Sequence, residues 1–225
     1  LAPSASTTDI VDELTLRGQI HLERGRVTEA RSAFERAIVA AKGAPAPEPQ
    51  LGLGEVHMAN GQYPSAISAF NAALQASPNL TPAKIGMARA FLKQEKPSEA
   101  RTTLVSLNDP NFAGEIGYWL GQAQERLYAD KPSEALATYE KAIKAQPTEP
   151  RPYLAMANLQ AKLGRTEDAD ATVKDVLAKA SASERLHLGI GELRFRQERY
   201  AAALEQFEQA LTLQPENLQA LFDKG

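Results

Sequence analysis

The sequence contains no cysteine, which excludes disulfide bonds, thiolate metal sites and cysteine nucleophiles. It has only three histidines, too few for most metal or acid–base sites. No uninterrupted apolar run approaches the roughly 18 residues that a membrane-spanning helix needs. A formal net charge of −3 offers no broad basic surface for phosphates, which argues against a general nucleic-acid binder.

The residues that are present favour helices. Of the 225 residues, 43% are hydrophobic and 24% are charged, as in ordinary globular proteins. Ala and Leu supply most of the apolar residues, while Val and Ile are sparse, a balance that favours helix over strand. The opening residues LAPSASTTD are rich in Ser, Thr and Pro. We therefore expect residues 1–10 to be a flexible lead-in.

An alanine recurs along the chain with a spacing of 34 to 36 residues. The word KPSEA occurs at 96–100 and again at 131–135. Its alanine belongs to the series Ala30, Ala66, Ala100, Ala135, Ala169 and Ala203. Each is followed four residues later by a larger apolar or aromatic side chain, and in four units by another Ala three residues further on. Apolar spacings of 3, 4 and 7 predict a helix in every unit.

Each unit also has an upstream half that contains its own small residue, 12 to 14 positions before the recurring alanine. These residues are Gly18, Gly54, Ala88, Gly121, Ala157 and Gly191. Turn signals such as Gly25, Gly61 and Gly164 separate the halves, so each unit is predicted to be helix, short turn, helix. Small residues allow two helices to approach while a large side chain of the partner fills the gap. One such hairpin cannot bury its apolar face alone, but a stack of hairpins can.

This pattern resembles the tetratricopeptide repeat family, a helical hairpin of 34 residues. The best match is the segment 50–78, QLGLGEVHMANGQYPSAISAFNAALQASP. The resemblance implies an all-α, right-handed superhelical solenoid that forms a single domain over residues 11–225. The six expected repeats span 11–44, 47–80, 81–113, 114–149, 150–183 and 184–217, and residues 218–225 would start a seventh. The fourth repeat needs about two extra residues between its helices, which leaves Trp119 either in the core or on the groove face.

No catalytic, metal or cofactor site emerges from the sequence. His21 and His57 occupy the same slot of repeats 1 and 2, as expected for side chains at the edge of a core. The glycine pairs in LGLGEV and LGIGEL lack the third glycine and the preceding strand of a dinucleotide-binding loop. Nor is there a nucleophile elbow. A related helical-repeat class reads RNA one base per repeat, but this acidic chain has no repeated pair of base-reading residues. We expect no enzyme, no cofactor and no nucleic-acid partner.

The resemblance implies that first-helix positions line a concave groove that binds a protein or peptide. Carried onto this sequence, the candidate groove residues are Arg89, Lys93, Tyr118, Trp119, Gln122, Arg126, Arg151, Asn158, Lys162, Arg185, Phe195 and Arg196. The corresponding positions of repeats 1 and 2 are acidic, including Asp12, Glu23, Glu48 and Glu55. We expect repeats 3 to 6 to bind an acidic or C-terminal segment of a partner. The alternative is that these charges only keep an exposed helix face soluble.

The expected function is that of a non-catalytic interaction scaffold, and a homo-oligomer stays open. The Ala-rich, Cys-free composition and the Ser/Thr/Pro lead-in resemble bacterial repeat proteins of the cell envelope that serve polysaccharide export, pilus assembly or secretion. This resemblance favours a periplasmic or envelope location. The alternatives are a cytoplasmic adaptor or co-chaperone and a regulatory array attached to an enzyme. Asn158, Arg151 and Lys162 resemble part of a carboxylate clamp for chaperone tails, but the neighbouring repeats lack the matching slots.

Overall fold

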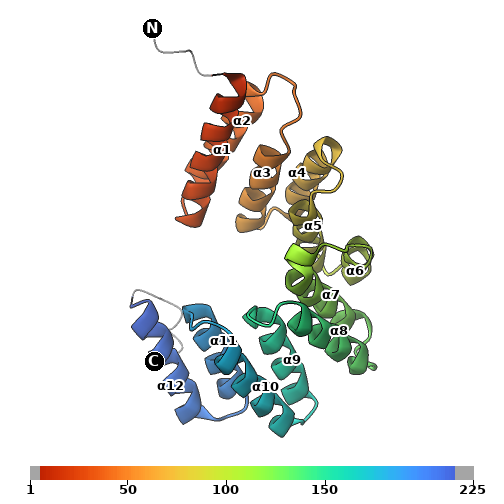
Figure 1. Cartoon of the computed structure of the whole chain (residues 1–225), viewed down its shortest axis with the longest axis vertical. Helices are drawn as coiled ribbons and strands as arrows, with labels where there is room; N and C mark the ends of the chain where they lie inside the picture. The colour runs from red at the N-terminus through yellow and green to blue at the C-terminus, as the bar shows by residue number, and fades with distance from the viewer. Residues whose placement is uncertain (1–5, 216–225) are drawn as a thin grey trace. The chain divides into compact units, whose positions relative to one another are not determined.

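The computed structural model describes residues 6–215 and contains in that range twelve α-helices, one short 3-10 helix and no strand. The elements are α1 (Thr7–Glu23), α2 (Val27–Ala40), α3 (Pro47–Ala59), α4 (Tyr63–Ala76), α5 (Thr81–Lys93), α6 (Pro97–Val105), η1 (Pro110–Phe112), α7 (Ala113–Leu127), α8 (Pro132–Ala145), α9 (Pro150–Lys162), α10 (Thr166–Lys179), α11 (Glu184–Arg196) and α12 (Tyr200–Leu213). They form six helix–turn–helix hairpins (Figure 1). The all-α prediction is confirmed.

The chain divides between Leu107 and Asn108 into two compact units, and each is described by itself. The first unit holds the hairpins α1–α2, α3–α4 and α5–α6, and the second holds η1 and the hairpins α7–α8, α9–α10 and α11–α12. Within each unit a hairpin packs on the next one, and first helices of successive hairpins also touch, as α7 touches α9 and α9 touches α11. The expectation of one domain over residues 11–225 stays a prediction.

The N-terminal lead-in is shorter than expected, because α1 already begins at Thr7. Ser6 caps this helix: its Oγ accepts from the Asp9 N–H (3.1 Å), and the Asp9 carboxylate accepts from the Ser6 N–H (2.9 Å). The hydrogen bonds from Ser6, the backbone one first, lower the pKa of Asp9. The remainder of the expected lead-in and the expected start of a seventh repeat at 218–225 lie outside the described residues.

The second helices begin as the repeated word KPSEA predicts. Pro97 and Pro132 are the first residues of α6 and α8, where the missing N–H of proline costs no hydrogen bond. The turn between the two helices of a hairpin contains a residue with positive φ in every described repeat except the fourth. That residue is Gly25, Gly61, Glu95, Gly164 or Glu198. The fourth turn, residues 128–131, is four residues long where the others have three, so it holds one extra residue where the spacing predicted about two.

Glycines face the aromatic ring at the centre of four second helices, those of Phe34, Phe70, Tyr139 and Phe207. In the first unit Phe34 is fully buried, and a Cβ added at Gly18 or at Gly52 would lie 2.5 or 2.4 Å from its ring. Gly18 belongs to the same hairpin as Phe34, whereas Gly52 belongs to the next. Phe34 therefore joins its own hairpin to the following one, as Phe70 does through Gly54 and Gly86, and a side chain at either glycine would displace the ring.

Replacing Gly121 with Ala tests this packing in the second unit. The added Cβ would lie 2.2 Å from the Tyr139 ring, an overlap that costs about 1–3 kcal/mol. The better helix propensity of alanine offsets up to about 1 kcal/mol of that cost. We expect a net loss of about 1 kcal/mol in the free energy of unfolding, measured in urea by the fluorescence of the single tryptophan, Trp119. The same exchange in a Tyr139→Leu background should cost less, and equal costs would show that the ring does not press on this position.

Candidate functional site

The first helices of the second unit line a polar hollow with an apolar floor. It encloses about 340 Å³ between α7, α9 and α11. Its lining residues are Tyr118, Gln122, Glu125, Arg151, Leu154, Ala155, Asn158, Lys162, Gly189, Glu192 and Arg196. Six of the residues expected from the sequence are among them: Tyr118, Gln122, Arg151, Asn158, Lys162 and Arg196. These six come from three successive repeats, so the helical repeat gathers on one face what is dispersed along the chain.

A second hollow of about 500 Å³ adjoins the first and shares Asn158, Lys162 and Arg196 with it. The two together are called the groove from here on. Among residues 6–215, the charged side chains that line this second part are Lys162, Arg196 and Arg199. The groove therefore has an apolar end at Tyr118 and Leu154 and a basic end at Arg196 and Arg199.

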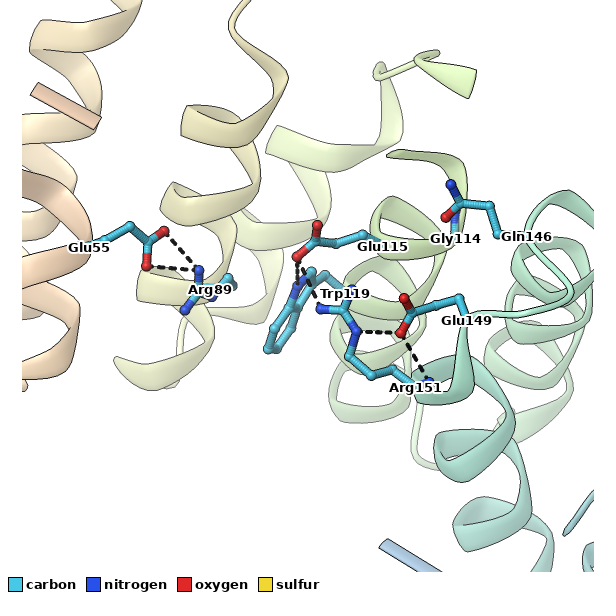
Figure 2. A network of polar contacts seen from close by, with 8 residues as sticks. All are labelled: Glu55, Arg89, Gly114, Glu115, Trp119, Gln146, Glu149 and Arg151. Carbon is cyan, nitrogen blue, oxygen red and sulfur yellow. Dashed lines mark hydrogen bonds and ion pairs between the residues drawn. The ribbon is translucent and has the colours of Figure 1, made fainter. Parts of the chain in front are cut away.

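Four other expected residues of this unit belong to the same first helices, α7 and α11. Trp119 packs edge-to-face on Tyr118, with ring centroids 4.7 Å apart, and its Nε1 donates to Glu115 (3.4 Å) (Figure 2). Arg126 is exposed and donates to the Gln122 carbonyl, while Arg185 is exposed near the start of α11. Phe195 is 54% exposed and packs edge-to-face on Tyr200. None of the four lines either hollow.

The two remaining expected residues, Arg89 and Lys93, belong to α5 of the first unit. Arg89 is held by Glu55 of α3, whose two carboxylate oxygens lie 2.8 and 3.1 Å from its guanidinium Nη1 (Figure 2). Lys93 is exposed in the last turn of α5. A role for these two residues in binding a partner stays a prediction.

Polar pairs join the first helices of successive repeats, and they change the charge expected of the groove. Arg151 of α9 is bound by Glu115 of α7 (3.1 Å) and by Glu149 (2.6 Å) (Figure 2). Burial opposes the charge of Arg151, but the hydrogen bonds and charges of these two carboxylates outweigh it and raise its pKa. Lys162 binds Glu125 of α7 (2.6 Å). The expectation of a mostly basic surface is thus incomplete, because the preceding repeat supplies a carboxylate for each of these two cations.

A buried tyrosine fixes the carboxylate that binds Lys162. Tyr139 stands where the family pattern has phenylalanine, and it is fully buried. Its hydroxyl accepts from Gln122 Nε2 (2.9 Å) and donates to Glu125 Oε2 (3.3 Å). Burial is the main reason that the pKa of Tyr139 is raised, so the hydroxyl keeps its proton and donates at neutral pH. Glu125 therefore accepts from Tyr139 through one oxygen and from Lys162 through the other.

The apolar end is formed by close packing. A Cβ at Gly189 of α11 would lie 2.5 Å from the Leu154 side chain of α9, so glycine lets these two helices meet at the floor. Tyr118 covers the other side and lies under the Arg151 guanidinium, 5.7 Å from its ring centroid. Burial raises the pKa of Tyr118, which stays neutral. This end offers an aromatic face and an aliphatic side chain to a ligand.

An ion-pair cluster at the back of the basic end holds α10 against the last hairpin. Asp170 of α10 binds Arg194 and Arg199, the latter at 2.8 Å. Burial acts to raise the pKa of Asp170, but the hydrogen bonds from the two arginines outweigh it and lower the pKa below its usual value. Because Arg199 also lines the groove, Asp170 fixes the position of a groove cation.

Replacing Asp170 with Asn should lower the free energy of unfolding at pH 7 by about 1 kcal/mol. Hydrogen bonds to charged groups are worth about 1.5–3 kcal/mol, and solvent screening reduces this value for a half-exposed carboxylate. A carboxyl group whose pKa is lowered by folding stabilises the protein above its unfolded pKa, and this contribution is lost as the pH falls through the folded pKa. The difference between wild type and variant should therefore shrink steadily below about pH 4. Urea unfolding at several pH values measures it, and a difference independent of pH would contradict the assignment.

The described part of the chain, residues 6–215, contains no group of three or more His, Asp or Glu side chains placed to hold a metal ion. In the same range no helix has both the length and the apolar character required to cross a membrane.

The stacked hairpins with a groove along their first helices define a helical-repeat protein. Family models described as tetratricopeptide repeat match residues 15–80, residues 57–115 and 126–191, and residues 184–217. The chain therefore belongs to the tetratricopeptide repeat family, and its fold is the all-α solenoid of that family. Proteins of this family mediate protein–protein interactions.

Solved structures agree with this fold. A tetratricopeptide repeat protein from Parabacteroides merdae matches with a TM-score of 0.74 and 15% identity, over 95% of this chain and 82% of that one. Pseudomonas aeruginosa pilF matches with a TM-score of 0.67 and 19% identity, over 96% and 97%. MamA from Desulfovibrio magneticus matches with a TM-score of 0.61 and 20% identity, over 77% and 96%. No curated protein sequence gives a significant match.

Proposed function

We propose that this protein is a non-catalytic scaffold that binds an extended segment of a partner protein in the groove of α7, α9 and α11. The observation that carries the proposal is the groove itself: two adjoining hollows share Asn158, Lys162 and Arg196. They form a continuous surface along three repeats. An extended chain can lie across such a surface and contact each repeat in turn.

The chemistry of the groove indicates the kind of segment. Tyr118 and Leu154 suit an apolar side chain at one end. Arg196 suits a carboxylate at the other, because arginine forms charge-assisted hydrogen bonds to carboxylates. Large aromatic and arginine side chains are also the types that contribute most to binding energy at protein interfaces. We therefore propose a partner segment with an apolar residue followed or preceded by an acidic one.

The place of such a scaffold in the cell is proposed on composition alone. The Cys-free, Ala-rich sequence and its Ser/Thr/Pro opening favour a complex of the bacterial cell envelope, such as one for polysaccharide export, pilus assembly or secretion. An adaptor in the cytoplasm is the second candidate.

Photo-crosslinking tests the binding face. Benzoylphenylalanine placed at Phe195, next to the basic end of the groove, should form an adduct with the partner in cells that make the whole protein. The matched control is Leu177 on α10, a second helix, where the side chain is similarly exposed at 44% against 54% for Phe195. Adducts from the Phe195 position alone support the groove. Adducts from the Leu177 position alone would move the binding site to the other helices and overturn the proposal.

A further inference from the structure

We infer that Glu125 sets the specificity of the groove: it excludes an acidic group of the partner from the surface at Lys162 and so confines acidic groups to the end at Arg196. This inference rests on the proposed function and concerns which segments the same groove accepts. It follows from the position, the charge and the fixation of one carboxylate.

Glu125 is held in place from both sides. Its Oε1 accepts from Lys162 Nζ at 2.6 Å, and its Oε2 accepts from the Tyr139 hydroxyl at 3.3 Å. Gln122 donates to the same hydroxyl oxygen at 2.9 Å, which directs the tyrosine proton towards Glu125. If Glu125 moved away, the buried Tyr139 hydroxyl would lose its acceptor, and a buried donor without an acceptor is costly. The carboxylate therefore stays beside Lys162 when a ligand arrives.

Lys162 by itself would attract acidic groups. Its side chain is 66% exposed, whereas that of Glu125 is only 21% exposed. An ammonium group has three N–H donors, so one bond to Glu125 leaves donors for a ligand. A partner carboxylate bound there would, however, lie within several ångströms of the Glu125 carboxylate. At about 6 Å in a water-like medium such repulsion weakens binding about threefold, and more where the ligand excludes water. A neutral amide or hydroxyl accepts from Lys162 without this repulsion.

The other groove cations differ in the carboxylates that bind them, and Arg199 is already bound by both oxygens of Asp170. Arg151 is bound by the two carboxylates of Glu115 and Glu149, so its end of the groove also disfavours an acidic ligand. Arg196 instead donates to the neutral amide of Asn158 at 2.7 Å. Its ion pair with Glu192 is long, at 3.8 Å, and the Glu192 side chain is 49% exposed, so water screens that carboxylate more than it screens Glu125. Acidic groups are thus directed to Arg196. The order along the groove gives the partner segment a polarity: apolar, then amide or hydroxyl, then acidic.

Selection from a library of random decapeptides displayed on phage tests this order without knowledge of the natural partner. The whole chain is used as wild type, as Glu125→Gln and as Glu140→Gln. The Glu125→Gln exchange keeps one acceptor oxygen, for the buried Tyr139 hydroxyl, places an NH2 group where the other oxygen faces Lys162, and removes the charge. Glu140 is exposed on α8, a second helix, so its exchange makes the same change in net charge away from the groove.

Peptides selected by the wild type and by Glu140→Gln should carry acidic residues at one end only. Those selected by Glu125→Gln should gain an interior acidic residue. In a synthetic wild-type-selected peptide, replacing an interior Gln or Asn by the corresponding acid should weaken binding to wild type at least about threefold and leave binding to Glu125→Gln nearly unchanged. Equal effects on the two proteins would overturn the inference while the groove function stands. If no peptide is enriched by any of the three proteins, the proposed function fails together with the inference.

Discussion

Replacement of Phe70 by Ala will lower the free energy of unfolding of the first unit by about 3–5 kcal/mol, the range found for deletion of a buried aromatic ring. The Phe70 ring is fully buried, and a Cβ at Gly54 or at Gly86 would lie 2.4 or 2.5 Å from it. Helices that meet at glycine cannot fill the space that the ring leaves, because they have no side chain to move into it. The cost of the cavity therefore adds to the loss of apolar burial.

Urea unfolding followed by far-ultraviolet circular dichroism measures this loss. Since domains are stable by only about 5–15 kcal/mol, the variant should unfold at a much lower urea concentration. Val39→Ala is the control in the same unit, because Val39 is 77% exposed and its truncation should change the stability by less than about 0.5 kcal/mol. A loss below about 1 kcal/mol for Phe70→Ala would show that the ring does not join the two hairpins.

The largest expected effect on binding follows reversal of charge at Arg196. Arg196→Glu should weaken binding of the partner segment that crosslinking identifies by about 30-fold or more, because a carboxylate replaces the donor at the basic end. Arg196→Gln, which removes the charge without reversing it, should give an intermediate loss. The affinity of the wild type should fall with added salt, as for any contact between opposite charges, and that of the Gln variant should fall less.

Lys174→Glu provides the matched control for this experiment. Lys174 is exposed on α10, a second helix, and its reversal makes the same change in net charge. Isothermal titration calorimetry of the three variants and the wild type measures the affinities, and circular dichroism verifies that each variant is folded. If Lys174→Glu weakened binding as much as Arg196→Glu does, only the overall charge of the protein would matter, and the groove would have no part in recognition.

The helical hairpins could be predicted from the sequence because each rests on a local pattern that recurs. Ala66, Phe70 and Ala73 follow the helical period, and the small residue Gly54 identifies the facing helix. The start of α1 was placed too late because Ser6 and Asp9 form a capping box within a stretch whose composition is that of a flexible segment. In this case, a local hydrogen-bond pattern outweighs composition.

The candidate groove was only partly predictable. Helical periodicity determines which side chains of each first helix share a face, which is why Tyr118, Asn158 and Arg196, all expected from the sequence, line the same hollow. That they bind a partner stays a prediction. Glu125 was missed because its effect depends on a lysine one repeat later. The spacing of 37 residues between Glu125 and Lys162 is a signal that a search for opposite charges one repeat apart could have found. The role of the Tyr139 hydroxyl could not have been found in this way. The repeat pattern calls for an aromatic ring at this position of the second helix because the ring packs in the core, and it specifies no hydroxyl.

The central claim is that the first helices of the second unit bind the partner. NMR chemical-shift mapping tests it most directly: the partner segment that crosslinking identifies is added, as a free peptide, to the whole chain. Binding in the groove predicts that the largest shifts fall on amides of α7, α9 and α11, among them those of Asn158 and Gly189. Shifts confined to α8, α10 and α12 would contradict the account, because the partner would then occupy the opposite helices of the same hairpins.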